Sequence, residues 1–183
     1  VLAREAGGKF DKNKLTIRIL GKQFSVDTAG TFSSDIHINL WVVMAVLGYL
    51  LNCQGVPVSG KWVPFRELAN GREKNGLFVQ RAEKPLKKIA DAHPNFFEDL
   101  IFLFNGRKVE NHYESDIALV LSPLPKLPIL ICYWKPEDGM ESELNLFFDA
   151  TAVENGGIEV IFGIGTGIVQ MFKKISLTHS WHK

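Results

Sequence analysis

The side chains that offer chemistry in this sequence are mostly carboxylates near the edges of predicted strands. Asp116 and Asp149 hold such positions, and two carboxylates share acid and base work when their surroundings separate their pKa values. One hypothesis is therefore an enzyme in which Asp116 or Asp149, together with His112, transfers protons. The structural alternative is that Asp149 is an N-cap or turn residue before the last predicted helix. Whether the protein is an enzyme stays open at this point.

A glycine-rich segment, Gly163-Ile-Gly165-Thr-Gly167, resembles in part a loop that binds phosphates at the start of a helix. The dinucleotide-binding pattern Gly-x-Gly-x-x-Gly, counted from Gly163, needs its third glycine at position 168, which is Ile168 here. We therefore expect these glycines to allow close packing within a helix. A helix that continues through Gly165 would exclude the phosphate loop.

The spacing of histidines and cysteines predicts no metal site and no cofactor. His179 and His182 are the only close pair of histidines, and two ligands without a third protein donor make a weak metal site. Cys53 and Cys132 lie far apart and form no Cys-x-x-Cys pair, which argues against an iron–sulfur cluster held by this chain. Both are expected to be buried free thiols, which favours a reducing compartment and a cytoplasmic location.

Length and composition predict one soluble globular domain over residues 1–183, with residues 1–8 and 176–183 as tails. Hydrophobic residues make up 46% of the chain and charged residues 22%, as in ordinary folded proteins. The net charge of +1 gives no global field that would attract nucleic acid. The longest apolar run, residues 40–51, is too short to cross a membrane and predicts a buried helix. We expect neither a nucleic-acid nor a membrane partner.

The elements that must position the candidate residues follow from hydrophobic periodicity and turn signals. A hairpin of strands 15–20 and 23–27 is followed by an apolar helix over 36–52, which has Ser34 or Asp35 as its N-cap and is expected to be central. Residues 54–76 predict a long ordered loop that contains Trp62 and Phe65. Further elements are helices over 83–92, 94–104 and 158–174, and strands over 116–122, 129–134 and 145–150. This order predicts an α+β fold with a mostly antiparallel sheet and about four helices.

The C-terminal part of the chain resembles an uncharacterised family called domain of unknown function 3786. The segments that carry the resemblance are Asp116-Ile-Ala118, Leu124-Pro-Lys-Leu-Pro128, Tyr133-Trp134 and Leu146-Phe-Phe-Asp149-Ala-Thr-Ala152. Earlier segments that agree are residues 15–26, Tyr49-Leu50 and the aromatic loop over 60–68. The chain departs from the family pattern after Trp134, where Lys135-Pro-Glu-Asp-Gly-Met140 stands.

The resemblance implies an association with redox or one-carbon metabolism in anaerobes, because some members carry an iron–sulfur segment that this chain lacks. Our first hypothesis is a non-catalytic accessory module that binds a small molecule or cofactor, or an iron–sulfur or other redox partner protein. Aromatic walls with a few carboxylates are typical of small-molecule sites. The predicted ligand-binding residues are Trp62, Phe65, Asp116, Trp134 and Asp149. The alternatives are the acid–base enzyme described above and a protein–protein adaptor with an exposed apolar patch around Trp62 or Phe104.

Overall fold

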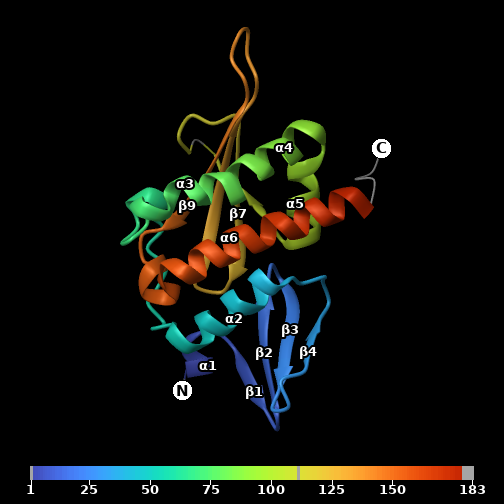
Figure 1. Ribbon diagram of the computed structural model, residues 1–183, viewed down its shortest axis with the longest axis vertical. Helices are drawn as coiled ribbons and strands as arrows, with labels where there is room; N and C mark the ends of the chain where they lie inside the picture. The colour runs from blue at the N-terminus through green and yellow to red at the C-terminus, as the bar shows by residue number, and fades with distance from the viewer. Residues whose placement is uncertain (1, 111, 179–183) are drawn as a thin grey trace.

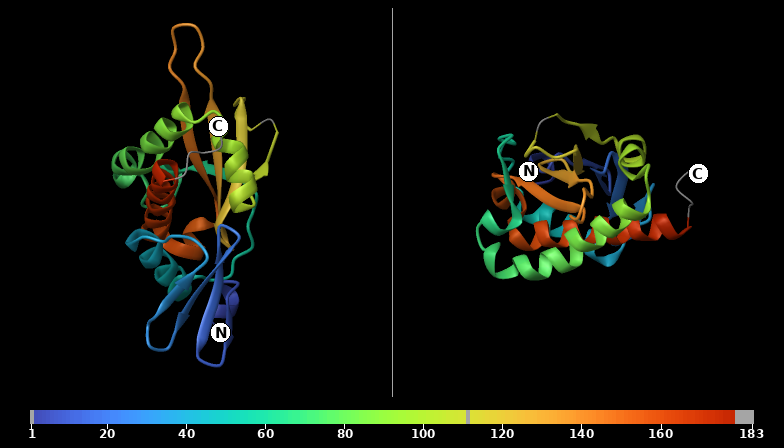
Figure 2. Two further views of the ribbon diagram at one scale, coloured as in Figure 1. Left: turned by 90° about the vertical axis from the view of Figure 1, so that its right-hand side faces the viewer. Right: turned by 90° about the horizontal axis from the view of Figure 1, so that it is seen from above.

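The computed structural model describes residues 2–110 and 112–178, and it arranges them as two antiparallel sheets with helices between and beside them (Figure 1). The predicted α+β class with a mostly antiparallel sheet is confirmed. The N-terminal sheet lies at one end of the molecule, and the second sheet forms the other end together with the helices that cover one of its faces (Figures 1 and 2).

The N-terminal sheet has the strand order β1-β2-β3-β4 and contains the predicted hairpin. Its strands are β1 (Lys9–Asp11), β2 (Lys14–Ile19), β3 (Lys22–Asp27) and β4 (Phe32–Ser34). Because Ile19 pairs with Lys22, only Leu20 and Gly21 remain in the turn between β2 and β3. Both residues have positive φ, 51° and 75°, as the tight hairpin turn that matches strand twist requires.

The second sheet has the order β5-β9-β8-β7-β6, and its three central strands are the predicted ones. The strands are β5 (Trp62–Pro64), β6 (Arg107–Lys108), β7 (Ile117–Leu124), β8 (Leu127–Trp134) and β9 (Glu143–Asp149). The segment over 54–76, predicted as a loop, contributes the edge strand β5 and two short 3₁₀ turns, Phe65–Glu67 and Arg72–Lys74. Between β8 and β9 a long hairpin projects away from the rest of the molecule (Figure 2).

Alternate residues of the central strands face two different hydrophobic clusters, as the period of a strand requires. The inner face contributes Leu119, Ile131 and Leu146 to the main core beneath the helices. The outer face forms a smaller cluster whose buried members are Ala118, Val120, Leu130, Cys132 and Phe147.

The principal helices are α2 (Leu40–Asn52), α4 (Lys84–Ala92), α5 (Phe96–Phe104) and α6 (Ala152–Thr178). Two short helices, α1 (Leu2–Glu5) and α3 (Asn75–Phe78), complete the set, and a π-helical turn over Val79–Glu83 leads from α3 into α4. The helices predicted over 83–92, 94–104 and 158–174 are all present. Helices α4, α5 and α6 pack against the inner face of the second sheet, while α2 packs along α6 (Figure 1).

Helix α2 differs from its prediction in its start and in its place. It begins at Leu40, because the side chain of Asn39 rather than Ser34 or Asp35 accepts the cap hydrogen bond, here from the Val42 N–H. It is not the central helix, because one whole face of it, with Leu40, Met44 and Leu51, is exposed. The core is filled instead by the apolar helix α5 and by α6, in which residues 160–169 are all buried.

The glycines of α6 serve close packing, as predicted, because the helix continues through Gly163, Gly165 and Gly167. A Cβ atom at Gly165 would lie 2.7 Å from the Phe78 ring, and one at Gly167 would lie 2.9 Å from the Val42 backbone nitrogen. The phosphate-loop interpretation is therefore excluded. By length and composition, the stretch Ala152–Ser176 is long and apolar enough to cross a membrane, but 72% of its most apolar window is buried inside the protein, as in a core helix.

Candidate functional site

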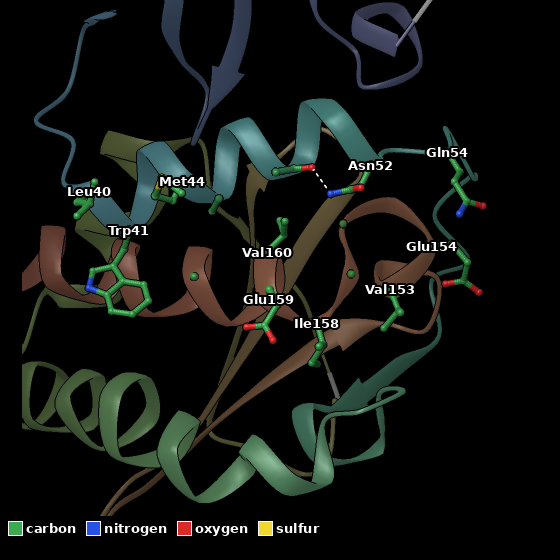
Figure 3. A pocket seen from close by; sticks show the side chains of 15 residues that line it. Leu40, Trp41, Met44, Asn52, Gln54, Val153, Glu154, Ile158, Glu159 and Val160 are labelled. Carbon is green, nitrogen blue, oxygen red and sulfur yellow. Dashed lines mark hydrogen bonds between the residues drawn. The ribbon is translucent and has the colours of Figure 1, made fainter.

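A groove of about 740 Å³ lies between α2 and the beginning of α6 (Figure 3). Its volume falls within the range of small-molecule sites. The groove forms where α2 and α6 approach closely: a Cβ atom at Gly48 would lie only 2.8 Å from the Val160 side chain. Near its beginning, α6 is interrupted at Gly157, whose φ of 74° and ψ of 162° are not helical. No atom lies within 4 Å of where a Cβ of Gly157 would stand, so the wall is open there.

The two ends of this α2–α6 groove differ in chemistry. Leu40, Trp41 and Met44 line one end, and two of these side chains, Leu40 and Met44, are 74% and 60% exposed (Figure 3). The Arg81 guanidinium lies 5.6 Å from the centre of the Trp41 ring, a cation–π contact that holds the indole in place.

The opposite end of the groove is polar. It is lined by Asn52, Gln54 and Glu154, which Figure 3 places together away from Trp41. The Asn52 amide donates to the Gly48 carbonyl at 2.8 Å, so its own side-chain oxygen remains available as an acceptor. The groove thus has an apolar half and a half rich in acceptors.

The charges that line the groove are negative. Its two ionisable residues are Glu154 and Glu159, and Glu159 forms an ion pair with Lys74. Among the described residues, no ion pair or hydrogen bond engages the Glu154 carboxylate. A ligand with a positive or hydrogen-bond-donating group would therefore complement this end of the groove.

Asp149, predicted as a ligand-binding residue, is completely buried and is engaged by the protein itself. Its carboxylate accepts hydrogen bonds from the backbone N–H of Gly60 at 2.6 Å and from the backbone N–H and hydroxyl of both Ser59 and Thr151. Burial raises the pKa of this carboxyl, but the bonds from Thr151, Ser59 and Gly60 outweigh burial and lower it. Asp149 anchors the chain before β5 to the end of β9.

The five predicted ligand-binding residues do not form one site. Trp62 pairs directly with Asp149 in the β5–β9 ladder, but the Phe65 ring turns into the main core, where it stacks on Phe78 at 4.1 Å. Trp134 pairs with Glu143 at the far end of β9.

Asp116 and Asp149 lie at opposite ends of the sheet, so the shared acid–base site predicted for them is not formed. Because Ile117 pairs with Tyr133, Asp116 adjoins the last residue of β8, where its carboxylate accepts from the Lys135 N–H at 2.7 Å. Asp149 adjoins the beginning of β8, which places the two carboxylates about 20 Å apart at the usual rise of a strand.

The outer face of the sheet is covered by the segment before β7. The Tyr113 ring stacks on Phe147 at 4.2 Å, and its hydroxyl donates to the Trp62 carbonyl at 2.9 Å. Trp62 and Trp134 are partly buried against this outer cluster. Both tryptophans thus take part in the packing of this face. Phe104 is buried as well, and Trp62 is only partly exposed, so neither side chain named for an apolar patch is itself fully exposed.

One polar cluster was not anticipated from the sequence. Asp91 of α4 accepts hydrogen bonds from the Ser142 hydroxyl at 2.6 Å and the Tyr133 hydroxyl at 2.9 Å, and it pairs with Lys87 at 3.1 Å. Burial raises the pKa of Asp91, but Ser142, Lys87 and Tyr133 together lower it. The cluster fastens the base of the projecting hairpin to α4. Only the Lys87-to-Asp91 spacing of four residues signalled it in the sequence.

Cysteines and histidines add no further site within the described residues. Cys53 and Cys132 are free and buried, as predicted. The part of the chain that the structure describes contains no cluster of three or more His, Cys, Asp or Glu side chains arranged to hold a metal. His179 and His182 lie outside the described residues.

The fold and the groove define an α+β protein of two antiparallel sheets with a mainly apolar groove between two helices. The chain belongs to the family Domain of unknown function (DUF3786), whose model matches residues 1–171. Neither a curated protein nor a solved structure matches it.

Proposed function

We propose that this protein is a non-catalytic binding module that holds a small amphipathic molecule in the α2–α6 groove. The observation that supports the proposal is the polarity of that groove. Leu40 and Met44 expose apolar surface at one end, and Glu154 offers an unpaired carboxylate at the other. An apolar tail with an amine or other donating head group complements both ends.

The size of the groove favours a small molecule over a protein. A stable protein interface buries about 20 to 30 residues on each partner, whereas 15 residues line this groove and several of them are buried. Its volume of about 740 Å³ is ample for a ligand with a chain of eight to ten carbon atoms.

Two of the carboxylates offer little support for the enzyme alternative. Asp91 and Asp149 are engaged by donors that lower their pKa, which makes each of them a weak base. A role in anaerobic redox or one-carbon metabolism and a cytoplasmic location stay predictions from the resemblance and from the free thiols.

The test compares two probes with the same tail and opposite head charge, octylamine and octanoate, by isothermal titration calorimetry below their micelle concentrations. We expect octylamine to bind more tightly than octanoate, because Glu154 attracts the ammonium. Met44→Gln should weaken octylamine about fivefold, since it removes roughly 1 kcal/mol of apolar contact. Glu154→Gln should reduce the preference for the amine.

A matched control is available on the same helix. Leu51 is 69% exposed on α2 but does not line the groove. Leu51→Gln should therefore leave octylamine binding unchanged. Equal weakening by Met44→Gln and Leu51→Gln would show non-specific adsorption and would overturn the groove as the site, while equal binding of both probes would overturn the assignment of the head group.

A further inference from the structure

A second hollow, of about 440 Å³, lies between α4 and the C-terminal half of α6, and its rim is basic. Lys84 and Lys88 are one helical turn apart on α4, and Lys173 faces them from α6. All three lysines are exposed, and helices α4 and α6 pack directly against each other.

The four lysines of this region divide into two groups. Lys87 lines a different hollow, where it is neutralised by Asp91 and lies 3.8 Å from the Glu141 carboxylate. Among the described residues, Lys84, Lys88 and Lys173 form no ion pair. The basic hollow is therefore a local concentration of unneutralised positive charge on a protein whose net charge is only +1.

Such an arrangement is unfavourable without a ligand. Like charges four residues apart on one helix destabilise it by about 0.2 to 0.5 kcal/mol, and Lys173 adds a third cation to the same hollow. Among the described residues, no acidic side chain lines the hollow, and residues 179–183, which follow α6 in the sequence, contain no Asp or Glu. An anion would relieve the repulsion among the three ammonium groups.

The floor of the hollow is apolar, which indicates the chemistry of the rest of the ligand. Pro85, Ile89 and Ala92 line it, together with the aliphatic parts of the lysines. A site with an apolar floor and a cationic rim complements a small organic anion better than a bare inorganic ion.

We infer that the basic hollow binds a small phosphorylated molecule, with its phosphate among Lys84, Lys88 and Lys173 and its apolar body against Ile89 and Pro85. This site is separate from the α2–α6 groove, where the carboxylate of Glu154 is unpaired and Glu159 is paired with Lys74. The two sites therefore suit ligands of opposite charge, and neither inference depends on the other.

The experiment is an NMR titration of the whole chain with phenyl phosphate, using benzyl alcohol as the uncharged probe of similar shape. Phenyl phosphate should shift the amides of α4 and of the C-terminal half of α6 in a saturable way. Benzyl alcohol should bind at least tenfold more weakly. The triple variant Lys84→Gln, Lys88→Gln, Lys173→Gln should weaken phenyl phosphate at least tenfold, and its unchanged far-ultraviolet circular dichroism would show that it folds.

Lys108→Gln is the matched control, because Lys108 is an exposed lysine on the edge strand β6. It should leave binding unchanged. Equal losses in the triple variant and in Lys108→Gln, or shifts spread over the whole surface, would overturn the site. If benzyl alcohol bound as tightly as phenyl phosphate, the inference that the ligand carries a phosphate would be overturned. Tighter binding of a 20-nucleotide RNA with a steep salt dependence would overturn the small ligand in favour of a polyanion.

Discussion

At the scale of single residues, Asp149 connects the chain before β5 to the second sheet through donors on Ser59, Gly60 and Thr151. Asp149→Asn should lower the free energy of unfolding by about 3 kcal/mol, because the new amide N–H₂ would face one of these donors and leave it unsatisfied. Urea denaturation at pH 7 measures the change. The control is Asp116→Asn, an exposed carboxylate with one backbone donor, which should cost less than about 1 kcal/mol.

The pKa of Asp149 predicts how the free energy of unfolding changes at low pH. The donors lower the pKa of folded Asp149 below its ordinary value of 3.8. Its contribution is therefore complete above the unfolded-state value and is lost as the pH falls through the folded one. The difference in stability between the wild type and Asp149→Asn should shrink when urea denaturation is repeated at successively lower pH below 4. A difference that stays constant would show that the ionised carboxylate is not what stabilises this connection.

At the scale of elements, the contact between α2 and α6 depends on glycines that allow the helix backbones to approach. Gly167→Ala should lower the free energy of unfolding by about 1 to 3 kcal/mol, although alanine favours helices, because its Cβ would meet the Val42 backbone nitrogen at 2.9 Å. Gly76→Ala, in α3, is the control: nothing lies within 4 Å of its Cβ position, so it should be neutral or stabilise slightly. Thermal unfolding by circular dichroism compares both. A neutral Gly167→Ala would contradict the close approach.

The elements also show which signals in the sequence were sufficient to predict a strand or a helix. Strands and helices with strong periodicity, such as β2, β7, β8 and α6, could be predicted because local pattern and tertiary environment agree. Strand β5 could not, because three residues that contain Pro64 carry no period, and only pairing with β9 makes them a strand. The place of α2 was mispredicted because its apolar sequence suggested burial on all sides. In the structure α6 covers only one side of α2, and the face with Leu40 and Met44 is exposed.

The candidate sites were harder to predict than the elements, since they depend on which strand ends meet. Asp116 and Asp149 both stand at the edge of a predicted strand. Only the register of β7, β8 and β9 shows that they lie at opposite ends of the sheet. Both hollows are bounded by α6 and by a helix far from it in sequence, α2 in one case and α4 in the other. A periodic pattern indicates which residues share a helix face, but it does not indicate which helix lies opposite.

At the scale of the whole molecule, the two sheets share one core. Ile17, Ile19 and Phe24 of the N-terminal sheet belong to the same hydrophobic cluster as the inner face of the second sheet. The backbone N–H of Leu20, in the β2–β3 turn, donates to the Ser122 carbonyl of β7 at 3.2 Å. The Tyr49 hydroxyl of α2 joins the two regions again, because it donates to the Ala6 carbonyl and accepts from the Lys126 N–H.

A shared core predicts that both sheets unfold in one transition, as a single domain does. Phe24→Ala, a large truncation in a fully buried position of the N-terminal sheet, should cost about 3 to 5 kcal/mol. Hydrogen exchange should then show β8 and β9 losing as much protection as β2 and β3, because their slowest amides exchange only through global unfolding. The tryptophans that the structure describes, at positions 41, 62 and 134, lie outside the N-terminal sheet, so a matching loss in urea denaturation followed by tryptophan fluorescence gives independent support. If β2 and β3 lost protection while β8 and β9 kept it, the N-terminal sheet would be a separate folding unit, and residues 1–183 would not be one domain.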